Sequence, residues 1–117
     1  MNAVDKDKCI DYIEFAATDL IETKRFYEDV FGWKFTDYGP DYTSFSDGRL
    51  GGGFYSVATN KKGGTLVVIY SADLESIQAK IQSAGGIIVK EIFEFPGGRR
   101  FHFADPSRNE LAVWSDK

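Results

Sequence analysis

The sequence is poor in cysteine, histidine and proline, and it lacks a long apolar run. Its 117 residues include one cysteine, Cys9, one histidine, His102, and three prolines. A single cysteine excludes an intrachain disulfide, and one cysteine with one histidine cannot form the clusters of zinc modules. The longest uninterrupted apolar run, Leu66 to Tyr70, is far shorter than a signal-peptide core or a ~20-residue membrane span. We therefore expect a cytoplasmic protein without a membrane anchor.

Positive charge is also in short supply. Fourteen Lys and Arg against eighteen Asp and Glu leave a net charge of −4. This is the wrong sign for a protein that binds nucleic acid or an anionic membrane. The basic doublets Lys61-Lys62 and Arg99-Arg100 adjoin Gly-Gly pairs and are typical of solvated turns. We expect neither nucleic acid nor a membrane as a partner.

Aromatic residues, in contrast, are plentiful. Ten Phe, six Tyr and two Trp are present, and 43% of the residues are hydrophobic. A chain of this length buries roughly two-thirds of its unfolded surface, so these residues suffice for the core of one domain over 1–117.

Two segments carry helix signals. Asp19 is a candidate N-cap with a glutamate three residues later, which predicts a helix over 20–31 that ends at Gly32. Asp73 begins a second segment, in which apolar residues recur at helical spacing up to Gly85-Gly86.

Eight segments with strand patterns are separated by short turns rich in Gly, Pro, Asp and Asn. The order is βαβββ twice, so the chain looks like one duplicated module, about 8–58 and about 64–116. A chance coincidence of two capped helices is the alternative. The predicted strands are Cys9–Ala17, Trp33–Tyr38, Tyr42–Ser46, Leu50–Val57, Thr65–Tyr70, Ile87–Phe95, Arg99–Phe103 and Glu110–Ser115.

Several motifs together resemble a known family. They are Tyr12-Ile13-Glu14-Phe15, Asp19, the run from Phe26 to Gly32-Trp33, and the closing segment Phe103-Ala104-Asp105-Pro106 to Asn109-Glu110-Leu111. With these the chain resembles the vicinal oxygen chelate proteins, the superfamily of glyoxalases, bleomycin-resistance proteins and extradiol dioxygenases. The resemblance implies an α+β fold, in which two βαβββ modules form curled mixed sheets around an open, cup-shaped barrel. It also implies a ligand in the cup and, usually, a homodimer.

The resemblance further implies a divalent metal, held by His, Gln or Glu side chains from the first and last strands of each module. Those positions fall on Tyr12, Val67, Ala112 and either Gly53 or Phe54. None of them carries a good metal donor, and the neighbours of Val67 are equally apolar. We therefore predict a cup without a metal cofactor.

Side chains alternate along a strand, so Tyr12 and Glu14 share one face, and Glu110 and Trp114 share another with Ala112. Glu14 and Glu110 could act as an acid or base or receive a cationic ligand group. Alternatively, each lies at a strand end in water or pairs with an arginine. The predicted ligand-binding residues are Tyr12, Glu14, Tyr55, Val67, Ile69, Phe101, Phe103, Glu110, Ala112 and Trp114.

His102 lies between Phe101 and Phe103. If both phenylalanines point into the cup, His102 faces the other side and is a surface or interface residue, whereas the opposite facing would make it a candidate general base. Trp33 is at core spacing. The run Gly51-Gly52-Gly53 lacks the context of a phosphate loop and is interpreted as steric, opening room in the cup.

The leading prediction is a small-molecule-binding protein with an aromatic, metal-free cup, similar to the bleomycin-resistance branch. One alternative is a metal-dependent lyase, isomerase or dioxygenase, which would need ligands recruited from Glu14, Glu110 and His102. Another is a dimeric interaction module with a vestigial cup. The sequence identifies neither the ligand nor any reaction, and it leaves open whether the cup forms within one chain or across a dimer.

Overall fold

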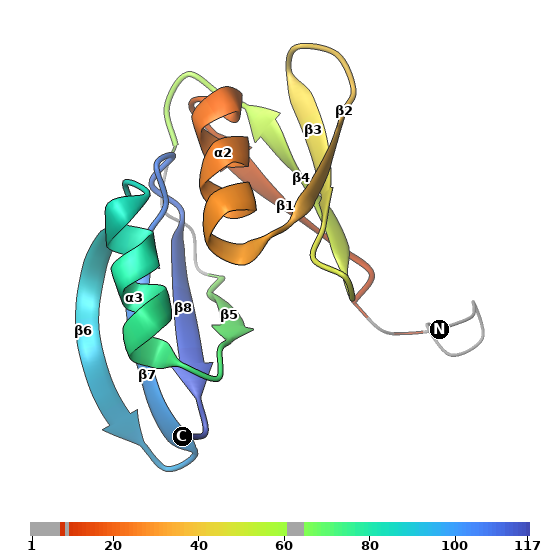
Figure 1. The fold of residues 1–117 in the computed structure, drawn as a ribbon. Coiled ribbons are helices and arrows are strands. Elements are labelled where there is room, and N and C mark those ends of the chain that lie inside the picture. The colour runs from red at the N-terminus through yellow and green to blue at the C-terminus, as the bar shows by residue number, and fades with distance from the viewer. Residues whose placement is uncertain (1–7, 9, 61–64) are drawn as a thin grey trace.

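The computed structural model describes residues 8, 10–60 and 65–117. These residues form two βαβββ modules (Figure 1), as predicted. The first module contains β1 (Tyr12–Ala17), α2 (Leu20–Phe31), β2 (Lys34–Asp37), β3 (Tyr42–Ser46) and β4 (Gly51–Ser56). The second contains β5 (Val67–Tyr70), α3 (Leu74–Ser83), β6 (Ile87–Phe95), β7 (Gly98–Ala104) and β8 (Glu110–Ser115).

Each module builds its own four-stranded mixed sheet. The order is β1-β4-β3-β2 in the first sheet and β5-β8-β7-β6 in the second. In both sheets the first strand of the module pairs in parallel with the last, and the other pairs are antiparallel. The two sheets are separate and do not close into a barrel (Figure 1). The strands β1 and β5 are therefore outer strands of their sheets.

The helices begin where the capping signals predict. The Asp19 carboxylate accepts a hydrogen bond from the backbone N–H of Glu22 at 3.1 Å, and Gly32 ends α2 with a left-handed φ of 72°. Asp73 accepts from the N–H of Ser76 at 3.1 Å and so caps α3 in the same way. Neither described helix is long and apolar enough to cross a membrane.

The strand boundaries differ from the prediction at a few ends. The predicted start at Cys9 and the Lys61-Lys62 doublet lie outside the described residues, and β5 begins at Val67 rather than Thr65. The interpretation of Arg99-Arg100 as a solvated turn is wrong and the predicted strand that begins at Arg99 is confirmed, because both arginines lie within β7. Pairing of Phe95 with Gly98 closes the β6–β7 hairpin, so the chain is already extended again at the arginines.

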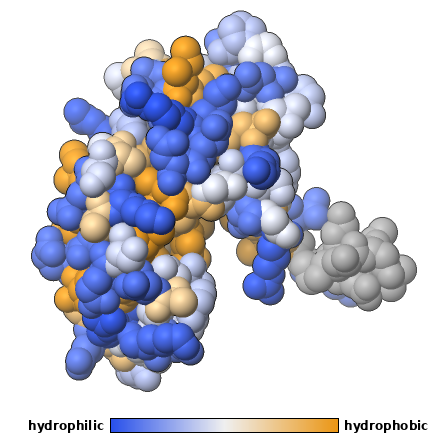
Figure 2. Space-filling model, viewed as in Figure 1, coloured by the Kyte–Doolittle hydropathy of each residue, from blue (hydrophilic) through white to orange (hydrophobic). Residues whose placement is uncertain are grey.

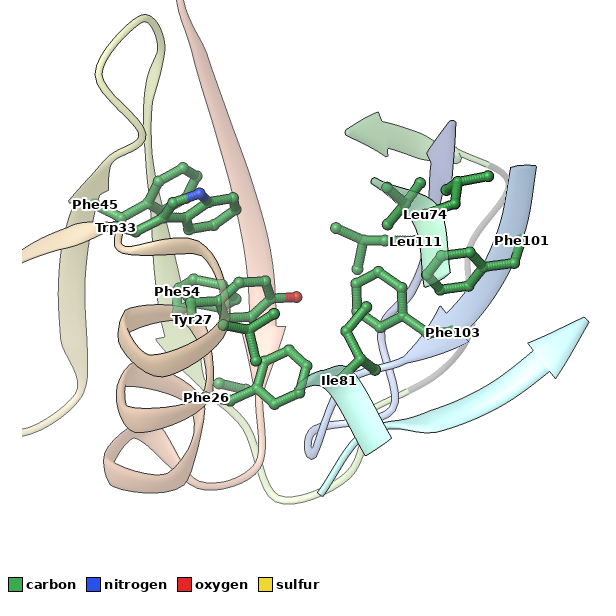
Figure 3. Packing of buried hydrophobic residues seen from close by; sticks show 13 residues of the cluster. Phe26, Tyr27, Trp33, Phe45, Phe54, Leu74, Ile81, Phe101, Phe103 and Leu111 are labelled. Carbon is green, nitrogen blue, oxygen red and sulfur yellow. The ribbon is translucent and has the colours of Figure 1, made fainter. Parts of the chain in front are cut away.

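One aromatic core lies between the two sheets (Figure 3). Phe26 of α2 packs against Phe103 of the second sheet, while Tyr27 of the same helix packs against Phe54 of the first. Trp33 stacks on Tyr27 with ring centroids 4.5 Å apart and equally closely on Phe45. Trp33 is therefore a core residue, as its spacing predicts, and α2 joins the two modules.

The Asp-Pro turn that follows β7 links the second module to the first by hydrogen bonds. The Asp105 carboxylate accepts hydrogen bonds from the backbone N–H groups of Ser107 and Asn109, each at 2.8 Å, and from the hydroxyl of Tyr27 at 2.9 Å. The Asn109 amide donates to the backbone carbonyl of Ala16 in β1 at 2.7 Å. The residues that carry the family resemblance here have a structural role, because they hold the two modules together.

Candidate functional site

Each sheet has one face against the helices and a second face, here called the open face, that turns away from them. In β1, Phe15 and Ala17 pack toward the core, while Tyr12 and Glu14 lie on the first open face. The first open face comprises Tyr12, Glu14, Tyr42, Ser44, Gly53 and Tyr55. The second comprises Val68, Tyr70, Lys90, Phe93, Phe95, Arg100, His102, Glu110, Ala112 and Trp114.

A chain of hydrogen bonds crosses the first open face. The hydroxyls of Tyr12 and Tyr42 are 2.5 Å apart, and Tyr42 donates to Glu14 Oε2 at 2.8 Å. Desolvation and these two neighbours raise the pKa of Tyr42, so this phenol stays protonated. A Cβ atom at Gly53 would lie 2.0 Å from the Tyr42 hydroxyl. Gly53 thus has a steric role, but the predicted room in the cup is not there, because Tyr42 occupies the space that the glycine leaves.

The second open face carries a histidine–carboxylate pair. His102 Nδ1 lies 3.0 Å from Glu110 Oε2, and the His102 side chain is only 8% exposed. Its register partner on β8 is Ala112. Among the described residues, His102 Nε2 and Arg100 Nε are buried without a hydrogen-bond partner. His102 therefore has the facing that makes it a candidate acid–base group.

Aromatic rings and cations surround this pair. The Phe93 ring centroid is 6.0 Å from that of His102. The Arg100 guanidinium and the Lys90 ammonium each lie 5.3 Å from the Phe93 centroid, and Arg100 is also 5.6 Å from Phe95. A cation placed over the face of an aromatic ring is attracted by the electrons of the ring. The second open face thus combines a base, two cations and an aromatic surface.

Trp114 lies at the edge of this surface, between Tyr70 at 5.2 Å and Phe95 at 6.3 Å. It also borders a cleft of about 750 Å³ between the two modules, which is lined by Phe15, Trp33, Phe45, Val67 and Ile69, among others. Figure 2 shows a hollow between the modules, with hydrophobic residues gathered on the side of the second module. The cleft is lined mainly by apolar residues, with Asp47 and Arg49 also on its wall, and does not include His102 or Glu110.

The predicted ligand-binding residues are divided among separate places. The first open face holds Tyr12, Glu14 and Tyr55, and the second holds Glu110, Ala112 and Trp114. Val67 and Ile69 line the cleft between the modules. Phe101 and Phe103 are fully buried in the core. The expected facing of β7 is therefore reversed, because its phenylalanines pack against the helices and not into an open face.

Sequence reasoning missed Tyr42, Lys90, Phe93, Phe95 and Arg100. The Asp105–Asn109 turn could have predicted which face of the sheet Arg100 and His102 occupy. This turn pairs Ala104 with Glu110, which places His102 opposite Ala112 and Arg100 opposite Trp114. Phe93 could not be placed, because the register of β6 shifts between Lys90 and Phe93.

The positions at which the resemblance implies a metal carry no suitable donors. On β5 the implied metal position was assigned to Val67, but the residue on the open face is Val68, which pairs with Ala112. On β4 the corresponding residue is Gly53, since Phe54 is buried in the core. The described residues contain no group of three or more His, Cys, Asp or Glu side chains that could hold a metal ion. The donor set therefore does not fit a divalent metal at this site.

Comparisons with known proteins agree with this architecture. The chain resembles a glyoxalase/bleomycin resistance protein/dioxygenase family enzyme from Burkholderia phytofirmans PsJN, with a TM-score of 0.80 and 16% identity over 92% of this chain and 100% of that chain. It resembles lactoylglutathione lyase from Agrobacterium tumefaciens with a TM-score of 0.73 and 18% identity, covering 92% and 93% of the two chains. The fosfomycin resistance protein FosX from Listeria monocytogenes gives a TM-score of 0.78 and 14% identity, with 91% of each chain covered.

At these identities the structural likeness shows the fold alone. No curated protein matches the sequence. The family model of the Glyoxalase/Bleomycin resistance protein/Dioxygenase superfamily, however, matches residues 9–113. The chain therefore belongs to the glyoxalase/bleomycin resistance protein/dioxygenase superfamily.

Proposed function

We propose that this protein binds a small, largely planar molecule in a metal-free cup whose walls are the open faces. The observation that carries the proposal is the second open face, where Trp114, Phe93 and Phe95 stand beside charged side chains and away from the core. Small-molecule sites combine apolar and aromatic walls with a few polar groups that orient the ligand. The residues at the strand positions of the implied metal site, Val68, Ala112 and Gly53, carry no metal-binding group, which supports a metal-free cup.

We further propose that a second copy of the chain completes the cup. Each open face is only one wall, and β1 and β5 are outer strands. Tyr12, Tyr55, Val68 and Tyr70 are all more than 40% exposed on these faces. A two-fold dimer would oppose the first open face of one protomer to the second open face of its partner and cover both edges. A cytoplasmic location fits the single cysteine.

Trp114 provides the test of ligand binding. In a Trp33→Phe variant, Trp114 is the only tryptophan, so its fluorescence reports on the second open face during titration with a panel of aromatic metabolites and planar antibiotics. We expect at least one compound to change this signal. Because stacking adds on the order of 1 kcal/mol beyond area burial, Trp114→Ala should weaken its binding by about tenfold or more, while Trp33→Ala mainly lowers stability. Unchanged fluorescence across the panel would contradict the proposal.

The competing metal-dependent function has its own test. His102 and Glu110 are neighbours, but Glu14 lies on the other sheet, so these three candidate ligands do not gather on one face of one chain. We expect protein dialysed against manganese, nickel or zinc to retain no stoichiometric metal by elemental analysis. One ion bound per chain would favour the lyase, isomerase or dioxygenase alternative. A dimer that binds no compound and no metal would instead favour an interaction module.

A further inference from the structure

The Glu110 carboxylate lies beside one ring nitrogen of His102. The carboxylate oxygen faces Nδ1 at 3.0 Å, and an ionised carboxylate can only accept a hydrogen bond. In the neutral imidazole the hydrogen therefore resides on Nδ1, and Nε2 carries the lone pair. The chain has a single histidine, so this is its one imidazole group. A ligand group placed at Nε2 of this neutral form has to donate a hydrogen bond.

The Nε2 atom is in an unusual position for such an acceptor. The His102 side chain is more than nine-tenths buried, yet Nε2 has no hydrogen-bond partner among the described residues. A buried polar atom without a partner is unfavourable, because it has lost its hydrogen bonds to water and forms none with the protein. In its neutral form Nε2 can thus accept a hydrogen bond that no described residue supplies.

The Arg100 guanidinium can only donate hydrogen bonds, so its partner must be an acceptor. It lies two residues from His102 on the same face of β7, and its Nε is also buried without a partner. Lys90 shares the Phe93 ring with it. Within the described part of the chain, neither cation has a salt bridge to a carboxylate, whereas Arg99 pairs with Glu75. Two unpaired cations over one ring favour an anionic group.

From these contacts we propose that the second open face binds a planar small molecule that carries a carboxylate and, at the opposite end, a hydroxyl. Residues two apart on one strand face are separated by about 7 Å. The carboxylate would pair with the Arg100 guanidinium, with Lys90 nearby, and the hydroxyl would donate its hydrogen bond to His102 Nε2. The ring between them lies on the aromatic surface of Phe93, Phe95 and Trp114. This inference rests on the proposed function, because it names the ligand class of the same face.

The charges around His102 agree with this assignment. Glu110 from β8 contacts the imidazole, and Lys90 from β6 and Arg100 from β7 lie on the same face of the sheet. Phe93 lies against both His102 and Arg100, so its ring belongs to the same surface as these two groups. The register of β6 shifts next to Phe93, and such bulges are common where a strand re-aims a side chain beside a binding site.

Three matched probes test the proposal on the full-length, untagged protein. They are 4-hydroxybenzoate, benzoate, which lacks the hydroxyl, and 4-methylphenol, which lacks the carboxylate. We expect 4-hydroxybenzoate to bind about tenfold or more tighter than either. With ¹⁵N-histidine labelling, the one Nε2 resonance should move toward its hydrogen-bonded position with 4-hydroxybenzoate and stay in place with benzoate.

Variants identify the groups involved. Arg100→Gln should weaken binding of 4-hydroxybenzoate by about tenfold or more, whereas Arg25→Gln, at an exposed arginine of α2, should leave it unchanged. His102→Gln should remove the preference for 4-hydroxybenzoate over benzoate while leaving benzoate binding intact. Glu110→Gln should reduce the same preference and serves as the second variant if His102→Gln fails to fold in a thermal melt.

The outcomes separate this inference from the proposed function. Equal binding of 4-hydroxybenzoate and benzoate, or an unmoved Nε2 resonance in saturated protein, overturns the inference. Failure of 4-hydroxybenzoate to bind, while another planar compound changes Trp114 fluorescence, overturns it as well and leaves the proposed function standing. If neither the three probes nor the wider panel affects Trp114, both fail together.

Discussion

Three consecutive glycines of β4 have three different surroundings. A Cβ atom at Gly51 would meet nothing closer than 3.6 Å. At Gly52 it would lie 2.2 Å from the Ile13 carbonyl oxygen and 2.4 Å from the buried Phe45 ring. At Gly53 it would strike the hydroxyl end of Tyr42. Only the last contact involves a side chain that can swing toward solvent.

Alanine at each glycine should therefore have a graded effect on the free energy of unfolding, measured by urea denaturation. We expect Gly52→Ala to cost about 3 kcal/mol or more, because backbone and core must move, and Gly51→Ala to cost less than about 0.5 kcal/mol. Gly53→Ala should cost about 1 to 2 kcal/mol, since Tyr42 can rotate away. Equal stability of the Gly51 and Gly52 variants would contradict the register of β4.

Asp105 makes stability depend on pH. Burial raises the pKa of its carboxyl above the ordinary value of 3.8, although hydrogen bonds from Asn109, Tyr27 and Ser107 oppose the shift. The folded protein thus binds this proton more tightly than the unfolded chain. The contribution of this group to stability is full below pH 3.8 and is lost as the pH rises through the folded pKa.

The Asp105→Asn variant removes this titration. We expect the free energy of unfolding of the wild type, relative to Asp105→Asn, to fall as the pH is raised from about 3 to about 7. Urea denaturation at several pH values measures the difference, and Asp29→Asn, at an exposed aspartate of α2, is the control. A difference that grows with pH would show that the carboxyl is stabilised in its charged form.

At the level of elements, both helices depend on the same capping device. Asp19 and Asp73 each accept one backbone N–H of the first helical turn at 3.1 Å. Asp19→Ala and Asp73→Ala should each lower the free energy of unfolding by about 1 kcal/mol. The Asn variants should cost much less, because the asparagine oxygen accepts the same bond. Equal losses for Ala and Asn would mean that charge at the helix N-terminus, rather than the cap bond, matters.

Elements of this kind could be predicted because their signals are local. The caps, the left-handed Gly32 and the turn residues place α2 at its observed bounds and β3, β6 and β8 likewise. The predicted ends of β5 and β7 were less accurate, because the ends of a strand depend on its hydrogen bonds to neighbouring strands.

At the level of the whole molecule, the separate sheets predict association. We expect light scattering at high micromolar concentration to give twice the mass of the chain. Val68→Lys, which places a charge on the open face of the outer strand β5, should shift the protein toward monomer, while Ile21→Lys, at an exposed position of α2, should not. A wild-type monomer at this concentration would refute the proposed dimer.

The residues at the implied metal positions lead to a prediction about chelation. A ligand that binds only the folded state raises the melting temperature, and its removal lowers it. We expect EDTA to leave the melting temperature unchanged, because the strand positions of the implied metal site hold Val68, Ala112 and Gly53. A decrease of several degrees in EDTA would reveal a structural metal.

The sequence by itself determined the two modules and the family, because these follow from short motifs and their spacing. It also determined that Phe101 and Phe103 face opposite to His102, since side chains alternate along a strand. It did not determine which of these faces is covered by the helices, because both faces of the second sheet carry aromatic residues.

The tertiary structure decided that choice. Phe101 and Phe103 are fully buried beneath the helices, where their apolar surface is removed from water, and His102 is left on the open face with Glu110. Lys90 and Phe93 reach the same face through a shift in the register of β6. The candidate site thus joins residues from β5, β6, β7 and β8, and such a grouping depends on strand pairing and burial between segments far apart in the chain.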